Sequence, residues 1–223
     1  YKIYNRYSYN YKNETEELTL LSKKWEELAQ RKKDLKASAY MLLIDEKKYA
    51  AFFPNERLSA ASSIKTAILV VALEMLDSGL LEWNEKLKLT DDVIGGGAGW
   101  MAYQPIGTSF PTHEVATEMI RISDNTATNL LIKRLGGINL INQKFKSLGL
   151  NSTELNMLLP DLKGTNKTTT KDLASLLANV DAGNILRPRS RDLFREIMST
   201  STSNRLIPGG ILKGLSGVNN DPD

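Results

Sequence analysis

The 223-residue sequence has no cysteine and a single histidine, His113. The lack of cysteine excludes disulfides, thiolate metal ligands and a cysteine nucleophile. One histidine argues against a zinc site or a Ser-His-Asp triad, and we expect neither a metal nor an organic cofactor. No apolar run approaches the roughly 18 residues of a transmembrane helix, so we expect no membrane span in this chain.

A strong charge of one sign is also lacking. The net charge is only +3, from 29 Lys and Arg against 26 Asp and Glu. This charge is too small and too dispersed to indicate nucleic-acid binding. The hydrophobic fraction of 41% is typical of a globular protein with an ordinary core. The chain begins at Tyr1 without Met, which is consistent with a mature exported protein.

The first third of the chain predicts a helix followed by a β-hairpin. Apolar residues recur at three- and four-residue steps between Thr15 and Leu28, with Thr15 as a candidate cap. Residues 39–45 and 49–53, separated by a tight polar turn, read as two antiparallel strands.

The segment Ser62-Ser-Ile-Lys65 precedes an apolar run, residues 67–73, that predicts a buried helix. Ser62 would therefore lie at a helix N-terminus with Lys65 one turn further on, on the same face. A serine hydroxyl needs a neighbouring base to become a nucleophile, and a lysine can be that base only if its pKa is lowered. Burial and the positive end of the helix dipole both lower it. Alone, the pattern also fits a plain helix cap beside a solvated lysine.

A second pattern, Ser123-Asp-Asn125, lies between two predicted helices. A short connection of this kind can present side chains to a site, although Ser-Asp-Asn is also ordinary turn chemistry. The agreement of the two patterns is much stronger evidence than either alone. The glycine-rich stretch 95–99 predicts a loop near the same site, with Trp100 or Tyr103 as a substrate-facing aromatic.

Together these residues resemble the family of class A β-lactamases and penicillin-binding proteins. The resemblance runs from about Lys36 to about Gly210. Beyond the two motifs it rests on Asn55-Glu-Arg-Leu, Ser123-Asp-Asn-Thr-Ala-Thr-Asn-Leu-Leu, Gly136-Gly137 and Thr168-Thr-Thr-Lys-Asp-Leu.

The resemblance implies roles for four residues. Ser62 is then the acylated serine and Lys65 its proton partner. Ser123 would relay a proton to the leaving group, and Asn125 would hydrogen-bond the substrate amide.

The sequence departs from the lactamase pattern between residues 149 and 166. Class A β-lactamases carry Glu-x-x-x-Asn there, and that glutamate activates the water that hydrolyses the acyl-enzyme. No register supplies the pattern here, and the best one puts Leu159 in the place of the glutamate. Glu154 and Asp161 are the acids of this loop, and we read both as solvated carboxylates.

The resemblance therefore implies a serine DD-peptidase, a penicillin-binding protein that acts on the D-Ala-D-Ala of peptidoglycan stem peptides and deacylates slowly from penicillin. β-Lactam antibiotics would be covalent inhibitors. We expect a monomer in the bacterial cell envelope, periplasmic or secreted. Two alternatives stay open: a class A-type β-lactamase that uses an acid such as Glu154, and a non-catalytic penicillin-sensing or wall-binding module.

The implied fold is α/β: an antiparallel sheet flanked by helices beside an all-helical lobe, with the active-site cleft between them. We expect residues 1–61 and 203–223 to form the α/β domain and residues 62–202 the inserted all-α domain. The family's third motif, Lys-Thr/Ser-Gly, is absent. We therefore expect the C-terminal strands and terminal helix to lie outside this chain.

Overall fold

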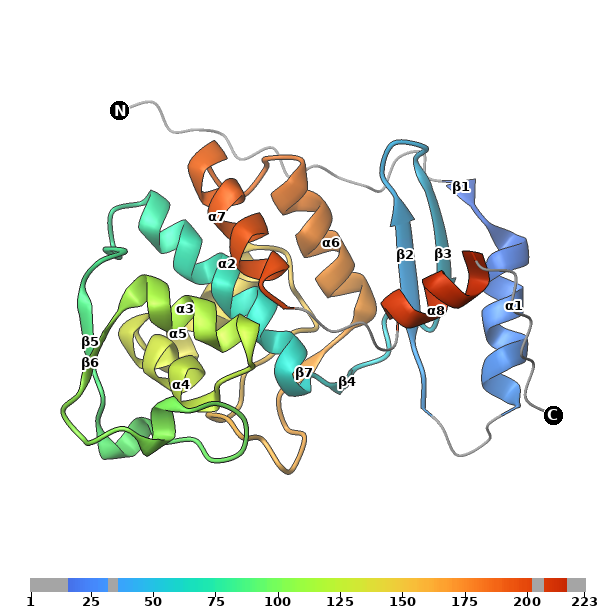
Figure 1. Ribbon diagram of the computed structural model, residues 1–223. Coiled ribbons are helices and arrows are strands. Elements are labelled where there is room, and N and C mark those ends of the chain that lie inside the picture. The colour runs from blue at the N-terminus through green and yellow to red at the C-terminus, as the bar shows by residue number, and fades with distance from the viewer. Residues whose placement is uncertain (1–15, 32–35, 202–206, 216–223) are drawn as a thin grey trace.

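The computed structural model describes residues 16–31, 36–201 and 207–215. It contains a small sheet with the first helix of the chain beside it and, next to these, a larger group of helices (Figure 1). The sheet has the strand order β1-β3-β2. Its strands are β1 (Glu16–Glu17), β2 (Ala39–Leu43) and β3 (Lys48–Phe52).

The central hairpin agrees with the prediction. β2 and β3 are antiparallel, with Ala39 opposite Phe52 and Leu43 opposite Lys48. The turn between them includes Lys47 at a φ of 51°, a left-handed conformation found mainly in turns. β1 pairs in parallel with β3, and α1 (Thr19–Gln30) packs beside that strand.

The start of α1 corrects the sequence prediction. The helix begins at Thr19, and residues 16 and 17 form β1 instead of its first turn. Leu18 is the N-cap and supplies no side-chain cap, whereas Thr15 lies outside the described residues. The backbone N–H groups of Glu16 and Leu18 donate to carbonyls of residues 47 and 49, so pairing with β3 outweighs local helix propensity here.

The helical group is built around α2 (Ile64–Asp77). From Ile64 to Met75 every side chain except that of Thr66 is buried. A helix that is apolar on all sides must be surrounded, and α2 packs against each helix from α3 to α7. These helices are α3 (Thr112–Arg121), α4 (Asn125–Arg134), α5 (Gly137–Ser147), α6 (Thr170–Asp181) and α7 (Pro188–Ser199).

Short elements connect the two groups. β4 (Leu58–Ser59) pairs with β7 (Lys167–Thr168), and Figure 1 places this pair between the sheet and the helices. The remaining elements are η1 (Ala61–Ser63), β5 (Lys86–Lys88), η2 (Asp91–Val93), η3 (Met101–Tyr103), β6 (Ser109–Pro111) and α8 (Ile207–Leu215). α2 thus begins at the junction of the two groups, directly after β4 and η1. The predicted domain boundaries themselves stay a prediction.

Within the described ranges, no helix combines the length and apolar character needed to cross a membrane. The same residues contain no cluster of three or more His, Asp and Glu side chains that could hold a metal ion.

Candidate active site

Ser62 lies where the chain turns from β4 into α2. It is the middle residue of η1, one turn before Lys65, and its side chain is exposed. The preceding Ala61 has a φ of 43°, so the backbone is strained immediately before the serine. Lys65 is only 2% exposed and lies in the first turn of α2. The helix start therefore presents a hydroxyl to solvent and buries an amine one turn further on, as the sequence predicts.

Ser123 connects these two side chains. It lies between α3 and α4 at a φ of 61°, a conformation uncommon for a non-glycine residue. Its Oγ donates to Ser62 Oγ at 2.8 Å and accepts from Lys65 Nζ at 2.9 Å. The three side chains form one chain of hydrogen bonds, ammonium to hydroxyl to hydroxyl, so a proton can pass between Ser62 and Lys65 through Ser123.

The Lys65 ammonium is held by three acceptors. Besides Ser123 Oγ, it donates to the Ser123 carbonyl at 2.6 Å and to Asn125 Oδ1 at 2.9 Å. Burial lowers the pKa of Lys65 from its usual 10.5 to about 8, although the Asp124 carboxylate opposes this change. A lysine with that pKa is neutral in about a tenth of molecules at pH 7, which makes it a usable general base.

Asn125 begins α4 and is 8% exposed. Its Oδ1 fixes Lys65, and its Nδ2 donates to the Gly96 carbonyl at 2.8 Å. A carboxamide nitrogen carries two hydrogens, so the bond to Gly96 uses only one of them. One hydrogen therefore remains for another acceptor, and the predicted role of Asn125 in hydrogen-bonding the substrate amide stays a prediction.

Asp124 holds the turn that carries Ser123 and Asn125. Its Oδ1 caps α4 by accepting from Ala127 N at 2.9 Å, and its Oδ2 accepts from the backbone N–H groups of Trp100 and Met101 at 2.8 and 3.0 Å. A Cβ at Gly99 would lie 2.1 Å from Asp124 Cγ. Only glycine fits this close approach, which explains part of the glycine-rich stretch.

The two aromatic residues predicted to face substrate have different surroundings. The Trp100 indole N–H donates to Glu118 Oε2 at 2.7 Å, and its ring stacks edge-on against Phe110. Its polar edge is therefore committed to α3. Tyr103 is 79% exposed. Among the described residues, no hydrogen bond joins either side chain to Ser62 or Ser123, and their role toward substrate stays a prediction.

Glu118 was not singled out from the sequence. It is 7% exposed and accepts from Arg121 Nε and Nη2 at 2.8 and 2.7 Å. The hydrogen bond from Arg121 keeps the pKa of Glu118 below its usual value; partial burial opposes this effect and the Trp100 indole supports it. The spacing of three residues between Glu118 and Arg121 on a helix was a signal that could have indicated this pair.

Leu159 is buried, at 5% exposed, yet it lies outside the main hydrophobic core. Both of its backbone polar groups pair with Asn129: Leu159 N donates to Oδ1 at 2.8 Å, and the Leu159 carbonyl accepts from Nδ2 at 2.7 Å. A Cβ on Gly95 would lie 2.5 Å from the Leu159 carbonyl and 3.0 Å from Asn125 Cβ. Leu159 is therefore joined to the start of α4, one helical turn from the residue that binds Lys65.

The model of the Beta-lactamase enzyme family matches residues 20–219 of this chain. That range includes all the residues of the site and most of the chain. This chain belongs to the β-lactamase enzyme family.

Curated relatives agree with this assignment. A β-lactamase of Bacillus amyloliquefaciens is 28% identical over 199 residues, which cover 83% of this chain and 62% of the relative. A β-lactamase of Bacillus subtilis strain 168 is 29% identical over 205 residues, which cover 86% of this chain and 63% of the relative. The chain thus spans a little under two thirds of the length of these relatives.

Solved structures show the same fold. PBP-A superimposes with a TM-score of 0.86 at 40% identity, covering 88% of this chain and 74% of that one. A leucine-to-glutamate variant of PBP-A, as an acyl-enzyme complex with penicillin G, has a TM-score of 0.85. A β-lactamase from Sphaerobacter thermophilus has a TM-score of 0.72 at 21% identity and covers 81% and 70% of the two chains, a likeness of fold alone. The predicted β-lactamase-like α/β fold is confirmed.

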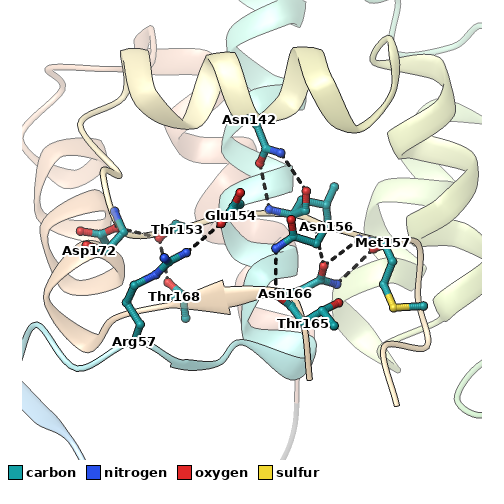
Figure 2. A network of polar contacts seen from close by, with 12 residues as sticks. Arg57, Asn142, Thr153, Glu154, Asn156, Met157, Thr165, Asn166, Thr168 and Asp172 are labelled. Carbon is teal, nitrogen blue, oxygen red and sulfur yellow. Dashed lines mark hydrogen bonds and ion pairs between the residues drawn. The ribbon is translucent and has the colours of Figure 1, made fainter. Parts of the chain in front are cut away.

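The two acids of the loop after α5 both have partners. Glu154 is bound by Arg57 Nη2 at 2.8 Å, in an exposed ion pair that joins the loop to the segment before β4 (Figure 2). Asp161 Oδ2 accepts from Asn166 N at 2.6 Å and Oδ1 from Thr165 Oγ1 at 3.2 Å. Partial burial raises the pKa of Asp161, but backbone N–H groups and the Thr165 hydroxyl outweigh it and lower that pKa.

Proposed function

We propose that this chain is the acylating part of a serine DD-peptidase of the penicillin-binding kind, which attacks the D-Ala-D-Ala bond of peptidoglycan stem peptides. The observation that carries the proposal is that Leu159, whose backbone is bonded to Asn129 one helical turn from Asn125, is aliphatic and lies in a loop whose acids are engaged elsewhere. A leucine cannot hold or deprotonate water, so a penicilloyl ester on Ser62 would persist.

The acylation step follows from the hydrogen-bond chain. Neutral Lys65 takes the Ser123 hydroxyl proton while Ser123 Oγ takes the proton of Ser62, and Ser62 Oγ bonds to the substrate carbonyl carbon. The scissile C–N bond then breaks, and Ser123 passes a proton to the leaving nitrogen. In the peptide reaction this releases D-alanine; in penicillin the amine stays tethered. Water or an amine finally displaces the acyl group, and Ser62 recovers its proton.

Two comparisons support this proposal. PBP-A is 40% identical to the chain and covers 88% of it. Its acyl-enzyme with penicillin G was captured in a variant that exchanges a leucine for a glutamate. These are the same two residue types that distinguish Leu159 from the lactamase pattern. Because a peptidoglycan substrate would be found in the cell envelope, we further propose that the protein acts there, periplasmic or secreted, as a monomer.

A β-lactamase is the second candidate, because the curated relatives carry that name. It would need a deacylating base, and Glu154, the acid considered for that role, is paired with Arg57. A non-catalytic penicillin-binding module is the third.

Exposing the intact protein to labelled penicillin and measuring its mass separates the candidates. We expect one penicilloyl group on Ser62 that outlasts the assay. In a separate reaction without penicillin, we expect the protein to release D-Ala from a synthetic D-Ala-D-Ala peptide. Drug consumption without an adduct would establish the lactamase, and neither consumption nor adduct would establish an inactive relative. A stable adduct without D-Ala release would indicate a sensor. Ser62→Ala should abolish the adduct, whereas Ser63→Ala at the neighbouring serine should retain it.

A further inference from the structure

Asparagine side chains form hydrogen bonds with the backbone of the segment Leu155–Leu159. Asn142, on α5, donates to the Leu155 carbonyl and accepts from Leu155 N, both at 2.8 Å. Asn166, just before β7, donates to the Met157 carbonyl at 3.1 Å and accepts from Met157 N at 3.0 Å. Figure 2 shows both carboxamides facing the backbone of the loop.

With the bond pair between Asn129 and Leu159, the pattern repeats at every second residue: 155, 157 and 159. A carboxamide carries a donor and an acceptor side by side, as a peptide group does, so each asparagine replaces one residue of a neighbouring strand. The three come from α4, α5 and the chain before β7. We call them the asparagine ladder.

The ladder is uncharged; two of its members are buried, and Asn142 is half-buried. Asn129 and Asn166 are 1% and 0% exposed, so their amide groups would be costly to bury without these partners. The segment they hold, Leu-Asn-Met-Leu-Leu, has no charged residue. The nearest ion pair, Arg57 with Glu154, is exposed and precedes the segment, so it contributes little.

We propose that Asn142 and Asn166 are positioning residues that hold Leu159 in its place beside α4 and so keep water from the penicilloyl ester on Ser62. This inference rests on the proposed function. Hydrolysis joins the oxygen of a water molecule to the acyl carbon and breaks the bond between the acyl carbon and Ser62 Oγ. One proton of the water returns to Ser62 Oγ. The acylating residues lie on η1, on α2 and in the connection between α3 and α4, so a loosened loop leaves acylation intact and lets water reach the ester.

The test compares Asn142→Ala and Asn166→Ala with Asn139→Ala, an exposed asparagine one turn before Asn142 on the same helix. Intact-mass spectrometry follows formation and loss of the penicilloyl adduct, and hydrogen exchange follows the amides of Leu155 and Met157. In the two ladder variants we expect adduct loss about tenfold faster and acylation within about twofold of wild type. Asn142→Ala removes two hydrogen bonds to the loop backbone, and Asn166→Ala removes three, because Asn166 Oδ1 also accepts from Asn156 N. Asn139→Ala should behave as wild type.

Asn142→Asp adds a second readout that a general loss of stability would not produce. Its ionised carboxylate has no donor for the Leu155 carbonyl, whereas its protonated form has one donor and one acceptor like the amide. Relative to wild type at each pH, adduct loss should be accelerated at pH 8 and return toward wild type as the solution is acidified.

The inference would be overturned if the Leu155 or Met157 amide lost its protection from hydrogen exchange while the rate of adduct loss stayed that of wild type. It would also be overturned if the rates of acylation and deacylation both fell by the same factor. If the wild type itself forms no lasting adduct, the proposed function fails. The ladder is then judged by amide protection alone: full protection in both alanine variants would refute it, and lost protection would retain its positioning role.

Discussion

Lys65 is buried and donates three hydrogen bonds, and its protonation should make the acylation of Ser62 depend on pH. Its pKa of about 8 lies below the usual 10.5 because burial removes water from the ammonium. Below about pH 8 most molecules carry a protonated Lys65, which cannot accept a proton from Ser123; above that pH the base form predominates.

The acylation rate of Ser62 should therefore rise with pH, about tenfold per unit below pH 8, and level off above it. Stopped-flow acylation by a chromogenic β-lactam between pH 6 and 10 measures this profile. A rate independent of pH across that range would remove Lys65 from the role of base.

Leu159 provides the second prediction at this scale. Leu159→Glu should place a carboxylate beside the site and shorten the life of the penicilloyl adduct by about a hundredfold or more, the usual contribution of a general base. Leu159→Gln has nearly the same shape without the base and serves as the control. Equal adduct lifetimes in the two variants would show that residue 159 does not face the ester.

Among the elements, the connection from α3 to α4 depends on Asp124. Its carboxylate accepts three backbone N–H groups, one from α4 and two from the chain around η3. Thr169 performs only the simpler task at α6, where its hydroxyl accepts from Asp172 N.

Asp124→Ala should consequently lower the free energy of unfolding by about 3 kcal/mol, because buried donors lose their acceptor. Thr169→Ala should cost about 1 kcal/mol, the usual value of a lost N-cap. Urea unfolding of both variants tests the difference. Similar costs would mean that the two bonds to Trp100 and Met101 contribute nothing.

The elements also show how far the sequence could be read. The hairpin and α2 were predictable because alternation and a continuous apolar run are local signals. The strand at residues 16 and 17 was not, since its partner is β3, more than thirty residues away. Ser62, Lys65, Ser123 and Asn125 converge as expected. The roles of Asn129, Asn142 and Asn166 went unnoticed, because asparagines in turns look alike until the backbone they bind is known.

At the scale of the whole molecule, α2 is the helix on which the others assemble. Leu69 in its centre is fully buried, whereas Leu20 on α1 is 87% exposed. Leu69→Ala should cost about 2–5 kcal/mol of unfolding free energy through the cavity it leaves. Leu20→Ala should change stability by less than about 0.5 kcal/mol. Thermal unfolding of both provides the comparison, and a stable Leu69→Ala protein would show that the helices pack without α2 as their centre.

By itself, the sequence determined which residues could do chemistry and which helix would be buried, because residue spacing and apolar runs are local signals that can be read from a short stretch of chain. It also excluded cysteine chemistry outright. Only the tertiary structure decided that Ser123 bridges Ser62 and Lys65, that Glu154 and Asp161 have other partners, and that three asparagines hold Leu155–Leu159 in place. Those arrangements join residues distant in the chain, and the hydrogen bonds that fix them exist only once the helices have packed.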